Sequence, residues 1–309
     1  MLPGYREPLG EKGLQRYRAL VQAAWDQLPA LEFSRIRGFR SWDGARLRLE
    51  HAMCGLAELD GDVDALIRIV SKDLSHAYSF LRVADLCAEH GRYDDALDWA
   101  QRGIQACGKE VDERLLTFCT AEYQRRGDAD NVEAFAWQRF TMGPTAEAFA
   151  ELMRVAKSIQ RHQAIRERAL AYLYAQIKKE EAPGRSRHPV WYEAMRSVLV
   201  QVLLAEQDDA QAWTVFNGGS VPQQLWAPMA QARGKTHPHD AIALYHRLLP
   251  ITIEAGRSGA RYDEAFKVLK AIGQLRSQLG EQAMFAVELE AIRAEHRAKR
   301  NFMKLVSRL

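Results

Sequence analysis

The chain has 309 residues, which is long for one compact domain and favours either two domains or an elongated array of repeats. Hydrophobic residues make up 47% of the chain and charged residues 27%, a balance typical of folded proteins that excludes a largely disordered chain. The net charge of +3 is too small to indicate a nucleic-acid-binding protein by itself.

Targeting signals are missing from the sequence. Residues 1–13 lack the apolar core of a secretory signal, and no stretch approaches the roughly 18 apolar residues of a membrane-spanning helix. The cysteines form no C-x-x-C pair and fall inside helical patterns, so we expect buried thiols in a reducing compartment. They are Cys54, Cys87, Cys107 and Cys119. These features predict a cytoplasmic protein with no membrane contact.

A first helix is predicted over residues 11–30, because its apolar residues recur on one side. They are Leu14, Tyr17, Leu20, Val21 and Trp25. The following residues, 33–50, interleave arginines with aromatic residues. The arginines are Arg35, Arg37, Arg40, Arg46 and Arg48, and the aromatic residues are Phe33, Phe39 and Trp42. Such a pattern can contact phosphates and stack on bases. The favoured alternative is structural, with the aromatic rings covering the core and the arginines facing water or pairing with Glu32, Asp43 and Glu50.

Residues 78–108 contain the clearest pattern in the chain. Apolar residues with helical spacing predict two amphipathic helices joined by a turn at Gly91, and Gly108 ends the second helix. The expected buried face of the first helix comprises Phe80, Val83, Ala84 and Cys87, and that of the second comprises Tyr93, Ala96, Leu97, Ala100 and Ile104. Small residues, Gly103 among them, allow the two helices to pack closely.

The opening of the second helix recurs along the chain. An acidic or polar residue, an alanine and a bulky apolar residue open each predicted second helix, because the acid complements the helix dipole and the alanine allows close packing. The repeated alanines are Ala65, Ala96, Ala134, Ala212, Ala241 and Ala265, with Ala169 as a weaker member. Their irregular spacing indicates divergent helix pairs.

The pair over residues 78–108 resembles a tetratricopeptide repeat, with Phe80, Val83, Ala84, Gly91, Tyr93 and Ala96 at the positions of the repeat frame. Cys87, Ala100 and Gly103 depart from the usual residues, so the repeat is degenerate. The resemblance implies an all-α fold, specifically a right-handed solenoid of divergent tetratricopeptide-like helix pairs.

Roughly residues 45–309 also resemble an uncharacterised family of bacterial helical-repeat proteins, often found as the C-terminal block of SWIM-type zinc-finger proteins. The segments that carry this likeness are HPHDAIALYHRLL, RYDEAFKVLKAI and RAKRNFMKLV, together with the pair over residues 78–108. The C-x-C and C-x-H pairs of a SWIM finger are missing, so its zinc and its DNA contact are not carried over.

Candidate metal and catalytic sites are weak. His237, His239 and His246 with Asp240 are the nearest approach to a metal cluster, but Pro238 and Asp240 are ordinary residues for a helix start. A zinc site needs three or four convergent ligands, and the usual spacings are missing. No phosphate loop or nucleophile motif occurs either. We therefore expect no cofactor, no metal and no enzymatic activity.

The organisation predicted from these patterns has four parts: residues 1–44, a tetratricopeptide-like block over 45–177, a linker over 178–189 and a second helical block over 190–309. Helices are expected at about 222–232, 238–255, 262–279 and 281–297. The C-terminal residues 293–309 are rich in bases, including Lys299, Arg300 and Lys304, while Phe302, Met303, Leu305 and Val306 are expected to pack as a cap.

The predicted function is that of a non-enzymatic scaffold or adaptor that binds another protein through a concave groove. Solenoids of helix pairs form such grooves mainly from the first helix of each pair. The residues left on the outer side of the first helix in the pair over 78–108 are Tyr78, Arg82, Asp85 and Glu89, and these are the expected partner contacts. The alternative is a nucleic-acid-associated regulatory or defence protein that uses residues 35–48 and the basic C-terminus.

Overall fold

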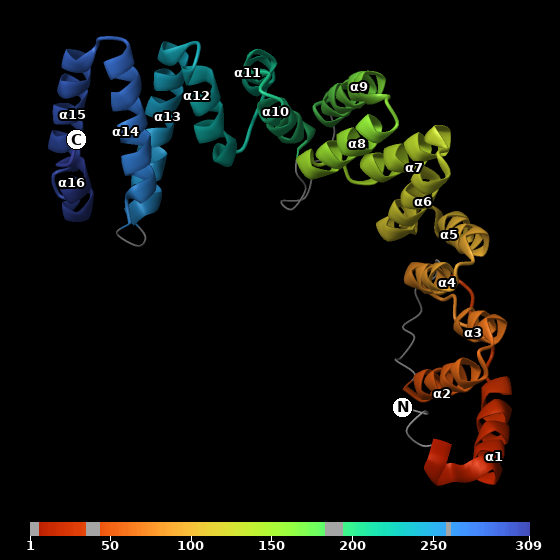
Figure 1. The fold of residues 1–309 in the computed structure, drawn as a ribbon. Helices are drawn as coiled ribbons and strands as arrows, with labels where there is room; N and C mark the ends of the chain where they lie inside the picture. Colours follow the sequence, from red (N-terminus) through yellow and green to blue (C-terminus); the bar gives the residue numbers. More distant parts are fainter. Residues whose placement is uncertain (1–5, 35–43, 183–193, 258–260) are drawn as a thin grey trace. The chain divides into compact units, whose positions relative to one another are not determined.

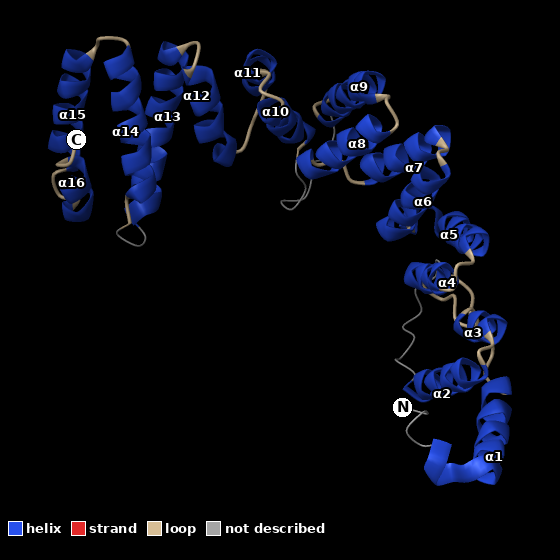
Figure 2. Cartoon of the chain, in the orientation of Figure 1, coloured by secondary structure: helices blue, strands red, loops and turns tan. Residues whose placement is uncertain are grey.

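The computed structural model describes residues 6–34, 44–182, 194–257 and 261–309, and all named structure in this part of the chain is helical. Pairing of the β type is limited there to a single parallel bridge between Leu31 and Asp73, and Figure 2 draws no strand in these residues. The prediction of an all-α protein is confirmed for these residues. None of their helices is both long enough and apolar enough to cross a membrane.

The chain divides into two compact units. Unit 1 comprises residues 1–143 and 155–160, and unit 2 comprises residues 144–154 and 161–309. Helix α8 (Ala146–Ser158) contributes to both units. The helices of unit 1 are α1 (Arg6–Asp26), α2 (Gly44–Asp60), α3 (Val63–Val70), α4 (Ala77–Glu89), α5 (Tyr93–Cys107), α6 (Glu113–Arg126) and α7 (Ala129–Met142), with a 3₁₀ turn, η2 (Gly108–Glu110).

Unit 2 continues the same kind of structure. Its helices are α9 (His162–Glu180), α10 (Met195–Ala205), α11 (Asp209–Asn217), α12 (Trp226–Gly234), α13 (Pro238–Arg257), α14 (Asp263–Gln278), α15 (Gln282–His296) and α16 (Arg300–Val306), with a 3₁₀ turn, η3 (Gln223–Leu225). The four helices predicted between residues 222 and 297 correspond to α12–α15. The first residues of the predicted linker, 178–180, form the end of α9, while residues 183–189 lie outside the described part of the chain.

Consecutive helices pack against each other within each unit, as Figure 1 shows for α4 with α5 and for α14 with α15. The pair α4–α5 coincides with the pair predicted over residues 78–108. Phe80, Val83, Ala84 and Cys87 are buried as expected. Tyr93 is an exception, because its ring is exposed and lies under the Arg125 guanidinium of α6, 4.3 Å from the ring centre.

The same type of turn joins the two helices within several of the pairs. In the turn between α4 and α5, Gly91 has φ = 74° and the Arg92 amide donates to the Cys87 carbonyl at 2.8 Å, as in a Schellman motif. The same bond, from a residue to the carbonyl five positions earlier, closes the turns at Asp62, Asp128, Asp208 and Glu281. A glycine with positive φ precedes each of these residues except Asp208, which follows Gln207. A shared turn supports the interpretation of the chain as related helix pairs.

The repeated alanines fill close helix contacts with one exception. Ala96, Ala169, Ala212, Ala241 and Ala265 are completely buried, and Ala65 is half-buried. Ala134 is exposed, so its assignment to the core was wrong. Helix α7 begins after its N-cap Asp128, and its inner face therefore falls on Val132, Ala136 and Phe140. Val132, four residues after the cap, takes the place that Ala96 has in α5.

Other apolar residues follow the sequence pattern with small departures. In α1, Val21 and Trp25 are buried, whereas Leu20 is exposed, contrary to prediction. In α16, Phe302 and Val306 are buried and Met303 and Leu305 are half-buried, so this helix packs on the core as expected. Its contacts are with α14 and α15.

Candidate partner-binding surface

The predicted contact residues lie on one side of α4, spaced by four, three and four positions. Tyr78, Asp85 and Glu89 are exposed, and Arg82 is half-buried. The opposite side of α4 carries the buried residues Phe80, Val83, Ala84 and Cys87, so the core fixes the orientation of the outer side. The structure therefore places the four predicted residues together on one helix face.

Side chains from α2 and α6 flank this stripe. On one side, Arg82 donates from Nη2 to Oε1 of Glu50 in α2 at 2.6 Å. On the other side, the Arg114 guanidinium of α6 lies 4.7 Å from the centre of the Tyr78 ring. We call this surface the α2–α4–α6 face and define it by Glu50, Tyr78, Arg82, Asp85, Glu89 and Arg114. It combines the side chains of three alternate helices in unit 1.

Arg82 has a structural role within this face. The side chain of Glu50 is only 5% exposed, so loss of Arg82 would leave a buried carboxylate without its cation. Arg82 therefore stabilises the contact between α2 and α4 and is a poor position for testing partner binding. Tyr78 and Glu89 are better positions, because exposed side chains can be changed without opening the core.

Burial and neighbouring charges shift the pKa values of two groups at or near this face, the Asp85 carboxyl and the Cys54 thiol. Partial burial raises the pKa of the Asp85 carboxyl, and the neighbouring Glu89 raises it further, whereas Arg114 lowers it. Burial raises the pKa of the Cys54 thiol to about 11, and the negative charges of Glu50 and Glu58 contribute to this increase. Cys54 is therefore a neutral thiol at physiological pH, and thiols in this form are weak nucleophiles.

The other cysteines are core residues. Cys87, Cys107 and Cys119 are buried, and all four cysteines are unpaired. Burial raises the pKa of Cys107 to about 11 and that of Cys119 to about 12. These thiols pack as small apolar groups, as the sequence predicted.

The residues of the possible nucleic-acid contact have different environments. Arg35, Arg37 and Arg40 lie outside the described residues. Arg48 is exposed on α2. Lys299 is half-buried, and Arg300 and Lys304 are exposed.

Arg46, in contrast, is buried and belongs to the core of unit 1. It donates from Nη1 to the Pro29 carbonyl and from Nη2 to the Lys72 carbonyl, both at 2.9 Å. Its Nε lies 3.2 Å from a carboxylate oxygen of Asp73. These contacts hold residues 29–31 beside residues 72–74, so the inclusion of Arg46 among phosphate contacts is corrected to a structural role. Phe33 is partly buried against the core nearby, in agreement with the structural alternative for this segment.

The histidines that were the weak candidate for a metal site do not converge. His239 Nε2 lies 3.0 Å from Glu281 Oε1, and His246 Nε2 lies 3.6 Å from Glu288 Oε1. His237 instead contacts the Thr236 hydroxyl. Asp240 pairs with Arg233. Within the described part of the chain, no group of three or more histidine, cysteine, aspartate or glutamate residues is arranged to hold a metal ion.

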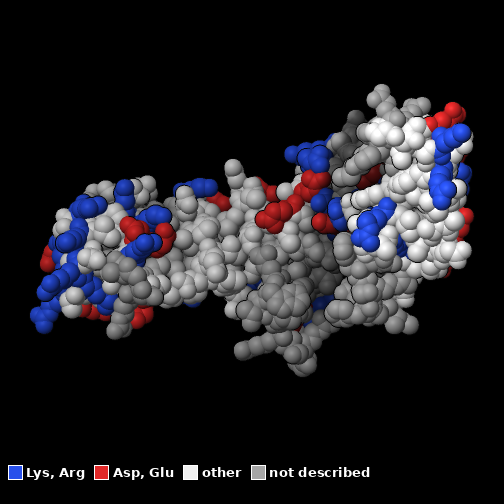
Figure 3. Space-filling model, turned by 90° about the horizontal axis from the view of Figure 1, so that it is seen from below, with Lys and Arg blue, Asp and Glu red and all other residues white. Residues whose placement is uncertain are grey.

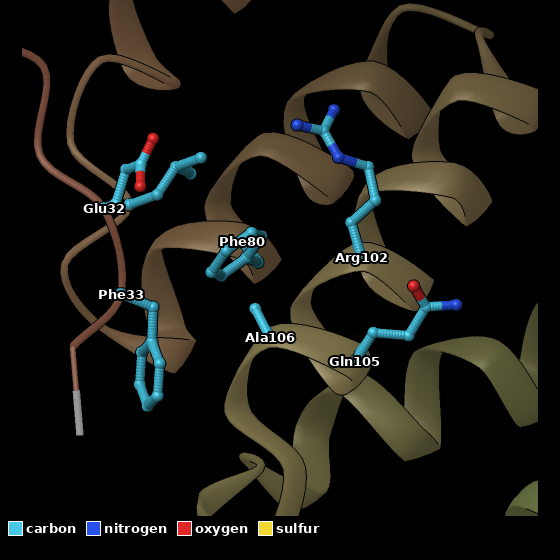
Figure 4. Close-up of a pocket in the computed structure, with 7 residues that line it drawn as sticks. Glu32, Phe33, Phe80, Arg102, Gln105 and Ala106 are labelled. Carbon is cyan, nitrogen blue, oxygen red and sulfur yellow. The ribbon is translucent and has the colours of Figure 1, made fainter.

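A hollow in unit 1 lies beside α4 and α5 and has a volume of about 480 Å³. Figure 4 shows Phe80 in its middle, with Glu32 and Arg102 on opposite sides of the ring. The Arg102 guanidinium also lies 3.8 Å from the centre of the Trp99 ring.

Sequence reasoning missed Arg114 and the pairing of Glu50 with Arg82. Arg114 is the second residue of α6, as Tyr78 is of α4, so superposing the two helix starts would have indicated that Arg114 belongs to the face. The Glu50–Arg82 pair joins residues 32 positions apart, and local spacing carries no signal for it. No protein-family model matches the chain, and a search of curated proteins also finds no match.

Proposed function

We propose that this protein is a non-enzymatic adaptor, built as a right-handed solenoid of tetratricopeptide-like helix pairs, that binds a segment of another protein through the α2–α4–α6 face. The observation that carries the proposal is the alignment of Tyr78, Arg82, Asp85 and Glu89 on α4, flanked by Glu50 and Arg114 from the neighbouring first helices. The recurring Schellman turns support the repeat interpretation.

The chemistry of the face suits protein recognition. Tyr78 is 48% exposed and is oriented by the stacked Arg114 guanidinium. Tyrosine and arginine are enriched among the residues that dominate binding energy at protein interfaces. A ring already held in place loses less conformational entropy on binding than a mobile one. The four unpaired cysteines agree with a cytoplasmic protein.

A nucleic-acid function has less support from the side chains. Arg46 is engaged by two carbonyls and a carboxylate in the core. We therefore place protein binding first.

The test is a comparison of partners retained by purified variants from native lysate, identified by mass spectrometry. Tyr78→Ser should lose specific partners, because removal of a central aromatic contact typically costs about 2 kcal/mol or more of binding energy. Tyr174→Ser is the matched control, since Tyr174 is an exposed tyrosine of α9 outside the face. Identical retention by Tyr78→Ser, Glu89→Lys and wild type would contradict the proposal.

A further inference from the structure

Helix α15 exposes an apolar stripe on its outer side. Although α15 packs against α14 and α16, Leu289 is its one buried residue. Val287 is 72% exposed and Met284 is 51% exposed. We define the α15 stripe by its exposed apolar members, Ala283, Met284, Val287, Ala291 and Ala294. Helical geometry places these residues on one face, opposite Phe285, Leu289 and Ile292.

The charged residues beside the stripe are largely paired with each other. Glu290, at one edge, lies 2.5 Å from Arg293 Nη1, and Glu295 lies 3.8 Å from His296 Nε2. Glu288 is turned away from the stripe and pairs with Arg276 of α14. Carboxylates therefore do not interrupt the centre of the stripe.

A row of cations follows directly after the stripe. Arg297 follows Ala294, the last residue of the stripe, by three positions. Arg300, Lys304 and Arg308 recur every four residues along α16 and its end, on the side opposite the buried Phe302 and Val306. Within the described residues, none of these four cations has an ion pair with a carboxylate. Figure 3 shows Lys and Arg side chains gathered over this end of the chain, at the left of the view.

The packing of α16 fixes the direction of these cations. The Phe302 ring lies 5.4 Å from the Tyr262 ring and 5.9 Å from the His296 ring. Arg293 adds a hydrogen bond from Nη2 to the Val306 carbonyl at 3.4 Å. Because the apolar side of α16 is held in this way, its basic side faces outward beside α15.

We propose that the α15 stripe and the cations Arg297, Arg300, Lys304 and Arg308 form a docking surface for an amphipathic helix of a partner protein, with acidic residues beside its apolar face. The alanines of the stripe let a second helix approach closely, and Val287 and Met284 supply the apolar contact. Carboxylates of the partner would neutralise the four cations, and such complementarity speeds association and sets orientation. This surface lies in unit 2 and is separate from the α2–α4–α6 face of unit 1.

Nucleic acids and membrane surfaces fit this docking surface less well than a protein helix does. Binding of single-stranded nucleic acid uses exposed aromatic rings to stack bases, whereas Phe285 and Phe302 here are turned into the protein. Helices that bind membranes bury large residues such as Trp, Phe and Leu in the lipid, whereas the stripe is mostly alanine. The observations therefore favour a protein helix.

The first experiment is photo-cross-linking of the full chain from a benzoylphenylalanine at Val287 in native lysate, with the same group at Ile251 as the matched control. Ile251 is another exposed aliphatic residue of unit 2. The expected result is a cross-link from position 287 alone, mapped by mass spectrometry to an acidic amphipathic helical segment. Cross-links to nucleic acid, to lipid or to a second copy of this chain, or no specific cross-link, would overturn the proposal.

The second experiment measures binding of that segment as a synthetic peptide. Val287→Glu should weaken binding at least tenfold, and Arg300→Glu/Lys304→Glu should weaken it at least tenfold while reducing its dependence on salt. The controls are Ile251→Glu and Lys178→Glu/Lys179→Glu, which make the same charge changes on exposed residues of α13 and α9. Unchanged affinity in the α15 and α16 variants would overturn the proposal, and unchanged circular dichroism spectra would show that they remain folded.

Discussion

Gly103 of α5 lies directly against Phe80 of α4. A Cβ atom added at Gly103 would come within 2.6 Å of the Phe80 Cβ and 3.0 Å of Leu115 Cδ1. No other residue type fits this contact unless the backbone shifts, so the glycine sets the spacing of the central helix pair and its contact with α6.

Gly103→Ala should therefore destabilise the protein. Overpacking of a core contact typically costs about 1–3 kcal/mol, and the better helix propensity of alanine offsets up to about 1 kcal/mol. We expect a net loss of about 1 kcal/mol in the free energy of unfolding, measured by urea denaturation. Gly143→Ala is the control, because a Cβ atom at Gly143 would meet nothing within 4 Å and its φ is not positive. Equal loss in both variants would show that the contact with Phe80 is not responsible.

The sequence was sufficient to predict the helix pairs, because apolar spacing and the Gly91 turn are local signals. Burial of Ala96, Ala212, Ala241 and Ala265 followed from the same pattern. The predicted burial of Ala134 was wrong, because the three-residue pattern of an acidic or polar residue, an alanine and an apolar residue does not specify where the helix starts. The N-cap Asp128 sets that start, and counting four residues from each cap would have given Val132.

The candidate surface was only partly predictable. Helical spacing identified the outer side of α4, since the buried residues fix the opposite side. The role of Arg46 could not be inferred from its neighbours, because its partners Pro29 and Lys72 lie 17 and 26 positions away. An arginine in a basic, aromatic segment has the same local pattern whether it binds phosphate or backbone carbonyls.

The recurring turn gives a pair of opposite predictions. Gly91→Ala places a side chain at φ = 74°, where left-handed backbone costs roughly 1–2 kcal/mol for residues other than glycine. We expect a lower melting temperature. Gln207 already occupies such a position, with φ = 62°, so Gln207→Gly should relieve strain and raise the melting temperature. Thermal unfolding of both variants tests this, and a shift of the same sign in both would contradict it.

Arg276 should be among the most sensitive positions in unit 2. Its guanidinium is buried and donates to Glu281 Oε2 and Glu288 Oε1, each at 2.5 Å. Arg276→Ala would leave the half-buried carboxylates Glu281 and Glu288 with only their contacts to His239 and His246. We expect a cost near the lower end of the about 3–5 kcal/mol that breaking a buried ion pair costs. Lys267→Ala is the control, because its pair with Glu264 is exposed and surface pairs contribute about 0–1 kcal/mol. Similar unfolding midpoints for the two variants would refute this ranking.

Arg46→Lys tests the structural role of Arg46. Lysine has no planar fork and cannot replace the donors to both the Pro29 and Lys72 carbonyls. Buried carbonyls that lose their donors typically cost about 1–3 kcal/mol. Unit 1 should therefore unfold at lower urea concentration, whereas Arg48→Lys should match wild type because Arg48 is exposed. Wild-type stability in Arg46→Lys would return Arg46 to the possible ligand contacts.

Glu122 makes the stability of unit 1 depend on pH. Its side chain is buried, and hydrogen bonds from Arg125, with those from Arg126, hold the pKa of the Glu122 carboxyl below its ordinary value, although burial opposes this. Arg126 also contacts the start of α5, where its Nη2 lies 2.7 Å from Asp94 Oδ1. The carboxylate thus links α6 to α5.

Because the folded state lowers this pKa, the carboxylate stabilises the protein fully above the unfolded value of about 4.3. That stabilisation is lost as the pH falls through the lower folded value. Glu122→Gln should therefore be less stable than wild type at pH 7, and its urea midpoint should fall less between pH 6 and pH 3. Glu89→Gln, which removes an exposed carboxylate of α4, should follow the wild-type curve more closely. If Glu122→Gln and wild type lost stability in parallel as the pH falls, the carboxylate would not be the titrating link between α5 and α6.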